Sequence, residues 1–216
     1  MHPAAILPLA LVSISLAQQP APQHPAPTAP ISLQLDCTDA PRRIFHSTLN
    51  IPCSPGPLTL VYPNWIPGEH APIGPIAGFS ISANHKPLPW RRDPTDMLAV
   101  RCDVPAGVSS ITVTLDYLSP TSDGTFTDGP ASTSQLAIID WHLMLVYPYD
   151  TTRPAPTDSL TYTASLKLPK GWRCGGALAR AGESPDAISF APTSLTMLVD
   201  HPVLIGAHYR DLNLTP

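Results

Sequence analysis

Apolar and polar residues alternate along several short segments of the chain. The alternation is clearest over residues 98–104, 111–117 and 160–168, where every second residue is apolar. Successive side chains of a strand point to opposite faces of its sheet, so a period of two indicates a strand with one buried face. We therefore predict half-buried antiparallel strands in these three segments.

Two longer apolar runs and the prolines extend this pattern. Residues 58–62 and 136–147 are mostly apolar, and we predict that the second run forms one long strand through the centre. The chain has 29 prolines, of which 22 follow residue 30. Proline is excluded from helix interiors and central strands, so it marks strand ends, edges and turns. The one helix-like window, residues 175–182, is too short to organise a core.

Together these features predict an all-β fold, an antiparallel β-sandwich or a pair of saddle-like curved sheets with almost no helix. We expect less than a tenth of the residues in helices, against about 30–35% in globular proteins generally. A hydrophobic content of 43% argues that the chain folds. The net charge is −4 and only 13% of the residues are charged, so the basic surface that nucleic acid requires is missing.

The N-terminal residues look like a signal peptide followed by a linker. Residues 6–16 are mostly apolar, and Ser15 and Ala17 are small residues at the positions that a signal peptidase reads. This run is shorter than the ~20 residues needed to cross a bilayer. We therefore predict a signal peptide at residues 1–17, export to the periplasm or the cell exterior, and no membrane span. Residues 18–30 form a Pro-rich linker, and residues 31–216 form the β-domain.

The four cysteines, at positions 37, 53, 102 and 174, each lie on the apolar face of a predicted strand segment. Export permits disulfides, and four cysteines allow three pairings, but buried free thiols fit the same pattern. If residues 31–37 and 43–51 form a hairpin, Cys37 and Cys53 lie ~30 Å apart. This exceeds the ~7 Å limit between bridged Cα atoms, so we expect no Cys37–Cys53 disulfide. Their spacing does not suit a zinc site either.

No catalytic motif accompanies this fold. A zinc peptidase of the zincin type needs two histidines at i and i+4 on a helix, with a glutamate beside the first. None of the eight histidines forms such a pair, and the two glutamates, Glu69 and Glu183, do not follow a histidine. His142 is expected to be a packed or edge histidine rather than a catalytic one, because neighbouring strand residues face opposite ways. We expect no catalytic residues, no metal ligands and no activity in this chain alone.

The segment Pro-Asn-Trp-Ile-Pro-Gly-Glu-His at residues 63–70 is the most distinctive in the chain. Two prolines and a glycine predict a rigid corner, where Trp65 can seal one end of the core. Alternatively, Trp65, Glu69 and His70 border a substrate cleft, with Glu69 receiving the amine of a peptide. A different class of function is an autonomous secreted binding module that presents Trp65, Trp90 or Trp141 to a peptide or glycan.

In the order of its motifs, the chain resembles the N-terminal β-domain of the glycyl aminopeptidase family. This is the sixty-first family of metallopeptidases, and its members are zinc enzymes of the gluzincin class. A strand leads into a Pro-x-Trp-x-Pro-Gly turn, then comes a Pro-Leu-Pro-Trp segment, and the domain ends in Leu-x-Asp-x-Pro-Val-x-x-Gly. After the turn glycine, Glu69-His70 replace the Ser-Tyr more often found in the family. The matching residues are Pro63, Trp65, Pro67, Gly68, Trp90, Asp200, Pro202 and Gly206.

The resemblance implies a non-catalytic domain that helps to shape the substrate cleft. In such proteins it precedes a thermolysin-like zinc domain, which is the expected partner in cis, and peptides are the expected substrate. Zinc is then expected only in a downstream catalytic domain. Because the sequence stops about where that domain would begin, we expect a fragment, a truncated gene product or a stand-alone relic.

Overall fold

The computed structural model describes most of the predicted β-domain. The predicted signal peptide and nearly all of the linker lie outside the described residues, and for residues 65, 66, 69 and 70 only the backbone is described. Strands account for 51% of the structure and helices for 9%, which confirms the all-β prediction. The described residues are 29–63, 65–66, 69–70, 74–120, 131–150, 156–212 and 214.

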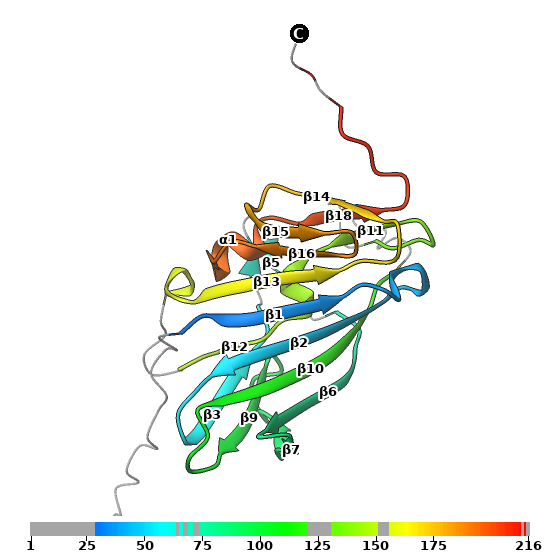
Figure 1. Ribbon diagram of the computed structural model, residues 1–216. Coiled ribbons are helices and arrows are strands. Elements are labelled where there is room, and N and C mark those ends of the chain that lie inside the picture. Colours follow the sequence, from blue (N-terminus) through cyan, green and yellow to red (C-terminus); the bar gives the residue numbers. More distant parts are fainter. Residues whose placement is uncertain are drawn as a thin grey trace, which may run out of the picture.

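A nine-stranded sheet forms the main layer, in the order β15-β16-β13-β1-β2-β10-β6-β7, with β17 also paired to β13 (Figure 1). All neighbours are antiparallel except β1 and β13, which run parallel with Ile31 opposite Tyr162. The strands are β1 (Ile31–Asp36), β2 (Ile44–Pro52), β6 (Ile76–Ala83), β7 (Lys86–Pro87), β10 (Ser110–Leu118), β13 (Thr161–Lys167), β15 (Arg180–Ser184), β16 (Ala187–Phe190) and β17 (Thr193–Ser194).

Two smaller sheets pack against the main one, and their buried residues join its buried residues in one hydrophobic cluster. In Figure 1 the four-stranded sheet lies behind β2 and β10, and the three-stranded sheet lies near β15 and β16. The four-stranded sheet is β12 (Tyr147–Pro148), β3 (Gly56–Val61), β9 (Ala99–Val104) and β8 (Trp90–Arg92). The three-stranded sheet is β11 (Leu136–Ile139), β18 (Val203–Gly206) and β14 (Arg173–Gly175). A separate ribbon pairs β4 (Trp65–Ile66) with β5 (Glu69–His70).

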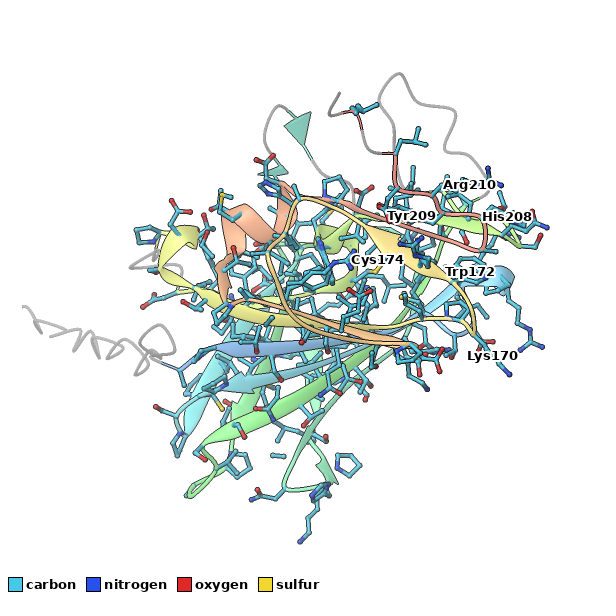
Figure 2. The ribbon with its side chains drawn as sticks, turned by 45° about the horizontal axis from the view of Figure 1, so that its top comes forward. Lys170, Trp172, Cys174, His208, Tyr209 and Arg210 are labelled. Atoms are coloured by element: carbon cyan, nitrogen blue, oxygen red, sulfur yellow. The ribbon has the colours of Figure 1, made fainter. Side chains whose placement is uncertain are left out.

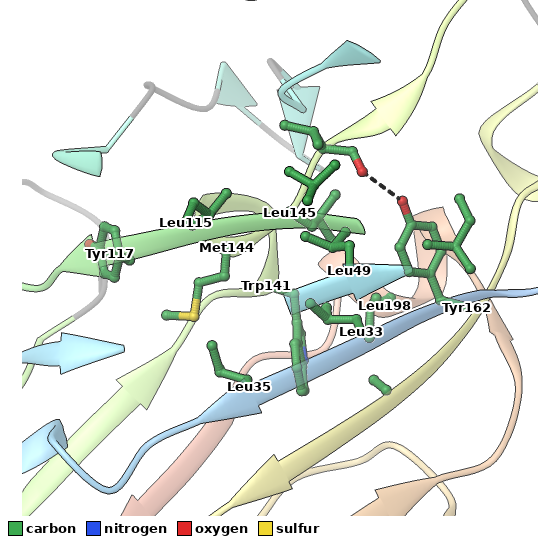
Figure 3. Packing of buried hydrophobic residues seen from close by; sticks show 14 of the residues in the cluster. Leu33, Leu35, Leu49, Leu115, Tyr117, Trp141, Met144, Leu145, Tyr162 and Leu198 are labelled. Atoms are coloured by element: carbon green, nitrogen blue, oxygen red, sulfur yellow. Dashed lines mark hydrogen bonds between the residues drawn. The ribbon is translucent and has the colours of Figure 1, made fainter. Parts of the chain in front are cut away.

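The predicted alternation matches the observed burial. In β10, every second residue faces the core, and the intervening threonines and Asp116 are only half-buried. The same pattern holds in β9 and β13. In the core, Trp141 is fully buried among the leucines of the main sheet, and the Tyr162 hydroxyl donates to the Val146 carbonyl at 3.3 Å (Figure 3).

The prediction of one long strand over residues 136–147 is wrong. The chain forms β11, then the 3-10 helix η2 (Trp141–Met144), then β12. All four residues of η2 are buried, whereas a strand at the surface of a sheet would turn every second residue outward. A continuous apolar run cannot by itself distinguish a strand from a buried helical turn.

The helix-like window at residues 175–182 is not helical. Gly175 ends β14, and β15 begins at Arg180. The single α-helix among the described residues is α1 (Leu195–Val199), where the Ser194 hydroxyl caps the start by accepting from the Met197 N–H at 3.2 Å. The other helical turns are η1 (Ala40–Arg42) and η3 (Thr157–Ser159). Within the described part of the chain, no helix has the length and apolar character needed to span a membrane.

Candidate functional site

The predicted cleft residues lie on the β4–β5 ribbon. Trp65 stands opposite His70 and Ile66 stands opposite Glu69, so the backbone brings all three candidates into one short hairpin. Their side chains are not among the described ones, and Pro67 and Gly68 lie outside the described residues. Contact between these side chains and a substrate therefore stays a prediction.

Pro63 and Trp90, from the first two motifs, differ in exposure, since Pro63 is buried and Trp90 is exposed. Pro63 is buried immediately before the ribbon. Trp90 is 36% exposed and packs edge-on against Phe79, with ring centroids 4.8 Å apart. Phe79 in turn contacts Tyr62, with centroids 6.1 Å apart, and burial raises the pKa of Tyr62 to about 12. This aromatic row joins β6 of the main sheet to the four-stranded sheet.

The third motif is the connection from α1 to β18. Asp200 is exposed and follows the last residue of α1, and Pro202 is also exposed. Gly206 is buried, and a Cβ there would lie 3.2 Å from the carbonyl oxygen of Gln135, the residue just before the neighbouring strand β11. This motif therefore forms the connection into β18, where Gly206 packs closely against the neighbouring segment.

The interpretation of Trp141 as a binding residue is wrong. Its side chain is fully buried, and its ring meets Phe190 edge-on with centroids 5.8 Å apart. The neighbouring His142 is packed, as predicted, but on η2 rather than on a strand. It is only 6% exposed, and burial lowers its pKa to about 4. It is therefore neutral over the physiological pH range.

The outer surface of the three-stranded sheet is apolar, and the sequence interpretation missed it. Leu136 and Leu204 are 44% and 40% exposed, and Ile138 lies directly opposite Leu204. We call Leu136, Ile138 and Leu204 the apolar face. The signal was present in the sequence, because residues 136–139 are apolar at every position and leave no polar residue for the outer side.

The segment after β18 folds back beside this face. The Tyr209 ring lies 5.3 Å from the guanidinium carbon of Arg173, and Arg173 also pairs with Asp211 at 2.5 Å. A hydrogen bond to Asp211 raises the pKa of the Tyr209 hydroxyl. Figure 2 shows Tyr209 beside β14, the strand that carries Cys174. The tyrosine hydroxyl occupies the space that a Cβ on Gly175 would fill, so this position accommodates the ring only because it is glycine.

The described residues contain no group of three or more histidine, cysteine, aspartate or glutamate side chains that could hold a metal ion. The main cluster of titratable groups places His46 between two carboxylates on the outer side of the main sheet. Its Nδ1 lies 2.7 Å from Asp116 and its Nε2 lies 3.3 Å from Asp39. This arrangement can hold a proton on the imidazole, but it provides no nucleophile and no metal site.

Residues 32–207 match the sequence model of the peptidase M61 N-terminal domain. The chain belongs to this family. The match covers all three sheets of the fold, which confirms the resemblance deduced from the motifs. In a comparison with curated proteins, the chain matches none.

Solved structures of an aminopeptidase N family protein and of an M1 zinc metallopeptidase share the fold of this M61 N-terminal domain. An aminopeptidase N family protein from Idiomarina loihiensis superimposes with a TM-score of 0.62 at 17% identity, over 82% of this chain and 29% of that protein. An M1 zinc metallopeptidase from Deinococcus radiodurans gives a TM-score of 0.52 at 10% identity, over 85% of this chain and 42% of that one. The domain thus spans less than half the length of these two structures.

Proposed function

We propose that this chain is the exported, non-catalytic N-terminal domain of a glycyl-aminopeptidase-like zinc metallopeptidase. In this proposal it supports a zinc catalytic domain in cis and shapes one side of the substrate cleft. The observation that carries the proposal is the family match over residues 32–207, which spans the whole described fold.

The apolar face is the proposed contact for the catalytic domain. Leu136 and Leu204 expose 44% and 40% of their surface side by side on one sheet, and grouped exposed apolar residues favour a protein contact. The segment that leaves β18 passes beside this face and is held there by Arg173 through Tyr209 and Asp211. Leu212 is 79% exposed further along the same segment. A domain joined through this segment would begin close to the apolar face.

The β4–β5 ribbon is the proposed cleft element. Its hairpin carries Trp65, Glu69 and His70 together, and Glu69 would receive the free amine of a bound peptide. A carboxylate forms a charge-assisted hydrogen bond with an ammonium group, which is stronger than a bond between neutral groups. This role predicts that Glu69→Gln raises the KM of the assembled enzyme more than it lowers kcat.

The test is a chimera that joins this chain to the zinc catalytic domain of another family member, in place of that protein's own N-terminal domain. We expect chelator-sensitive hydrolysis of glycyl-anilides by the chimera. The isolated chain should hydrolyse nothing and hold no stoichiometric zinc. In the chimera, Leu204→Glu should lower activity by disturbing the apolar face, whereas Ser189→Glu, on an exposed position of β16, should not.

Two results would contradict the proposal. One tightly held zinc in the isolated chain, with hydrolysis abolished by a chelator, would make this chain an enzyme by itself. A chimera with no activity, together with a stable monomeric chain that captures a peptide or glycan, would favour the autonomous binding module instead.

A further inference from the structure

The four cysteines lie as two pairs, and each pair spans the main sheet and a different smaller sheet. Cys37 directly follows β1 of the main sheet, and Cys174 lies on β14 of the three-stranded sheet. Cys53 directly follows β2 of the main sheet, and Cys102 lies on β9 of the four-stranded sheet. All four thiols are free, and three of the four residues are buried.

Cys37 lies beside the end of β13, and a short connection leads from that end to Cys174 on β14. The Cys37 N–H donates to the Lys167 carbonyl at 2.8 Å, which places Cys37 beside the last residue of that strand. The chain then turns tightly, with the Trp172 N–H donating to the Pro169 carbonyl at 3.0 Å, and enters β14. Cys174 is 4% exposed, so its side chain faces the interior that also holds Cys37. Burial raises the pKa of the Cys37 thiol, and electrostatic interactions with Asp36 and Cys174 raise it further.

Cys53 lies at a corner where the chain passes twice between the main sheet and the sheet that holds Cys102. The Cys53 N–H donates to the Ser109 carbonyl at 3.0 Å, one residue beyond the ladder of β2 and β10. From this corner residues 53–55 lead into β3 and residues 105–109 lead back from β9. Cys102 faces inward opposite Leu58 of β3. Burial raises the pKa of Cys102 to about 12, and the nearby charge of Cys53 contributes to that rise.

The hairpin of β1 and β2 excludes the first alternative pairing. Asp36 lies opposite His46 and Ser32 lies opposite Asn50, so Cys37 and Cys53 follow opposite ends of the hairpin. The predicted separation of these two cysteines is thereby confirmed. Of the three pairings that four cysteines allow, the arrangement in space favours Cys37 with Cys174 and Cys53 with Cys102.

We propose that the chain carries two disulfides, Cys37–Cys174 and Cys53–Cys102, which fasten the main sheet to each of the smaller sheets. Each bond forms when two thiols lose two protons and two electrons to an external disulfide, which is reduced to two thiols. The external disulfide is glutathione disulfide or the oxidised active site of a dithiol–disulfide oxidoreductase. The predicted signal peptide would bring the chain to a compartment where such oxidants act.

Because each proposed pair contains at least one buried cysteine, the bonds form while the chain folds. The experiment therefore refolds the full chain from denaturant, once with a mixture of reduced and oxidised glutathione and once with a reductant throughout. Remaining thiols are alkylated in denaturant, and the protein is digested with trypsin without reduction. Arg42, Arg91 and Lys167 separate the four cysteines in sequence, so each falls on its own tryptic peptide.

We expect no alkylated cysteine after oxidative refolding, and two cross-linked peptide pairs, one joining the peptides of Cys37 and Cys174 and one joining those of Cys53 and Cys102. The oxidised protein should melt on the order of 10 °C higher per disulfide than the protein refolded with reductant. Four alkylated cysteines after oxidative refolding, or any other cross-linked pair as the main product, would overturn the proposal.

Matched variants separate the two bonds. Cys174→Ala should leave Cys37 as the only alkylated cysteine and should leave the Cys53–Cys102 peptide pair intact. Cys102→Ala should free Cys53 alone and preserve the Cys37–Cys174 pair. Oxidation should raise the Tm of the double variant Cys37→Ala, Cys174→Ala by the same amount as it raises the Tm of Cys174→Ala, because both variants lack the same disulfide. If either single variant frees the wrong cysteine, the proposed pairing is wrong. The peptide map of the unmodified chain decides the question even if a variant does not fold.

Discussion

Trp141 donates its indole N–H to the carbonyl oxygen of His201 at 3.1 Å, across a sequence separation of 60 residues. The bond joins η2 to the turn between α1 and β18, so the buried indole supports the motif that ends the domain. A buried polar group without a partner is costly, and this bond satisfies both groups.

The Trp141 bond leads to a graded prediction. Trp141→Ala should lower the free energy of unfolding by about 3–5 kcal/mol, because it removes a fully buried aromatic side chain. Trp141→Phe should cost less, about 1–3 kcal/mol, chiefly from the His201 carbonyl left without its donor. Urea denaturation measures both, with the partly exposed Trp90→Phe as control. Equal losses for the two Trp141 variants would contradict the role of the indole N–H.

His142 should make the domain less stable in mild acid. Burial lowers its pKa to about 4 in the folded chain, against a reference value of 6.5. Its contribution is present in full above pH 6.5 and is lost as the pH falls from 6.5 toward 4, because the unfolded state then binds the proton. The loss should approach about 3 kcal/mol. Urea denaturation between pH 4.5 and 7.5 should show this slope in the unmodified chain. His142→Gln should flatten it, and an unchanged slope in that variant would show that another group is responsible.

His46 should act in the opposite direction. A hydrogen bond to Asp116 and a second to Asp39 raise its pKa despite partial burial. Its stabilising effect is present below the unfolded pKa and is lost as the pH rises through the folded value. The effect should be small because these side chains are about 40% exposed. In the His142→Gln background, stability should fall slightly above neutral pH, and Asp116→Asn should remove most of that fall. No difference between the two variants would mean that the pair contributes nothing measurable.

Gly175 should control the segment that follows β18. A Cβ at this position would collide with the hydroxyl end of Tyr209, so Gly175→Ala should displace the ring from Arg173. Because the atoms that have to move belong to the outer end of one half-buried side chain, Tm should change little. Trypsin should cleave after Arg210 faster than in the unmodified chain, and Tyr209→Ala should accelerate cleavage to a similar extent. Gly182→Ala is the control, because a Cβ there would meet only the Ser189 hydroxyl at 3.0 Å. This variant should be cleaved after Arg210 at the same rate as the unmodified chain.

The alternation of apolar residues was sufficient to predict the strands of β9, β10 and β13, because side-chain direction in a strand is a local property. It was not sufficient for residues 136–147, where the run is apolar on all sides and forms β11, η2 and β12. The motif at residues 198–206 indicated the family, but its function in the fold became clear only from the bond between Trp141 and His201.

By itself, the sequence determined that this is an all-β domain of the peptidase M61 N-terminal family, with a hairpin that separates Cys37 from Cys53. It also determined the lack of a zincin motif. Only the tertiary structure decided that β1 runs parallel to β13, that Trp141 is buried and that the apolar face is exposed. It also decided which cysteine pairing the arrangement in space favours. These features depend on which distant segments pair and in what register. The pairing is set by the burial of all three sheets in one core, and no local sequence pattern encodes it.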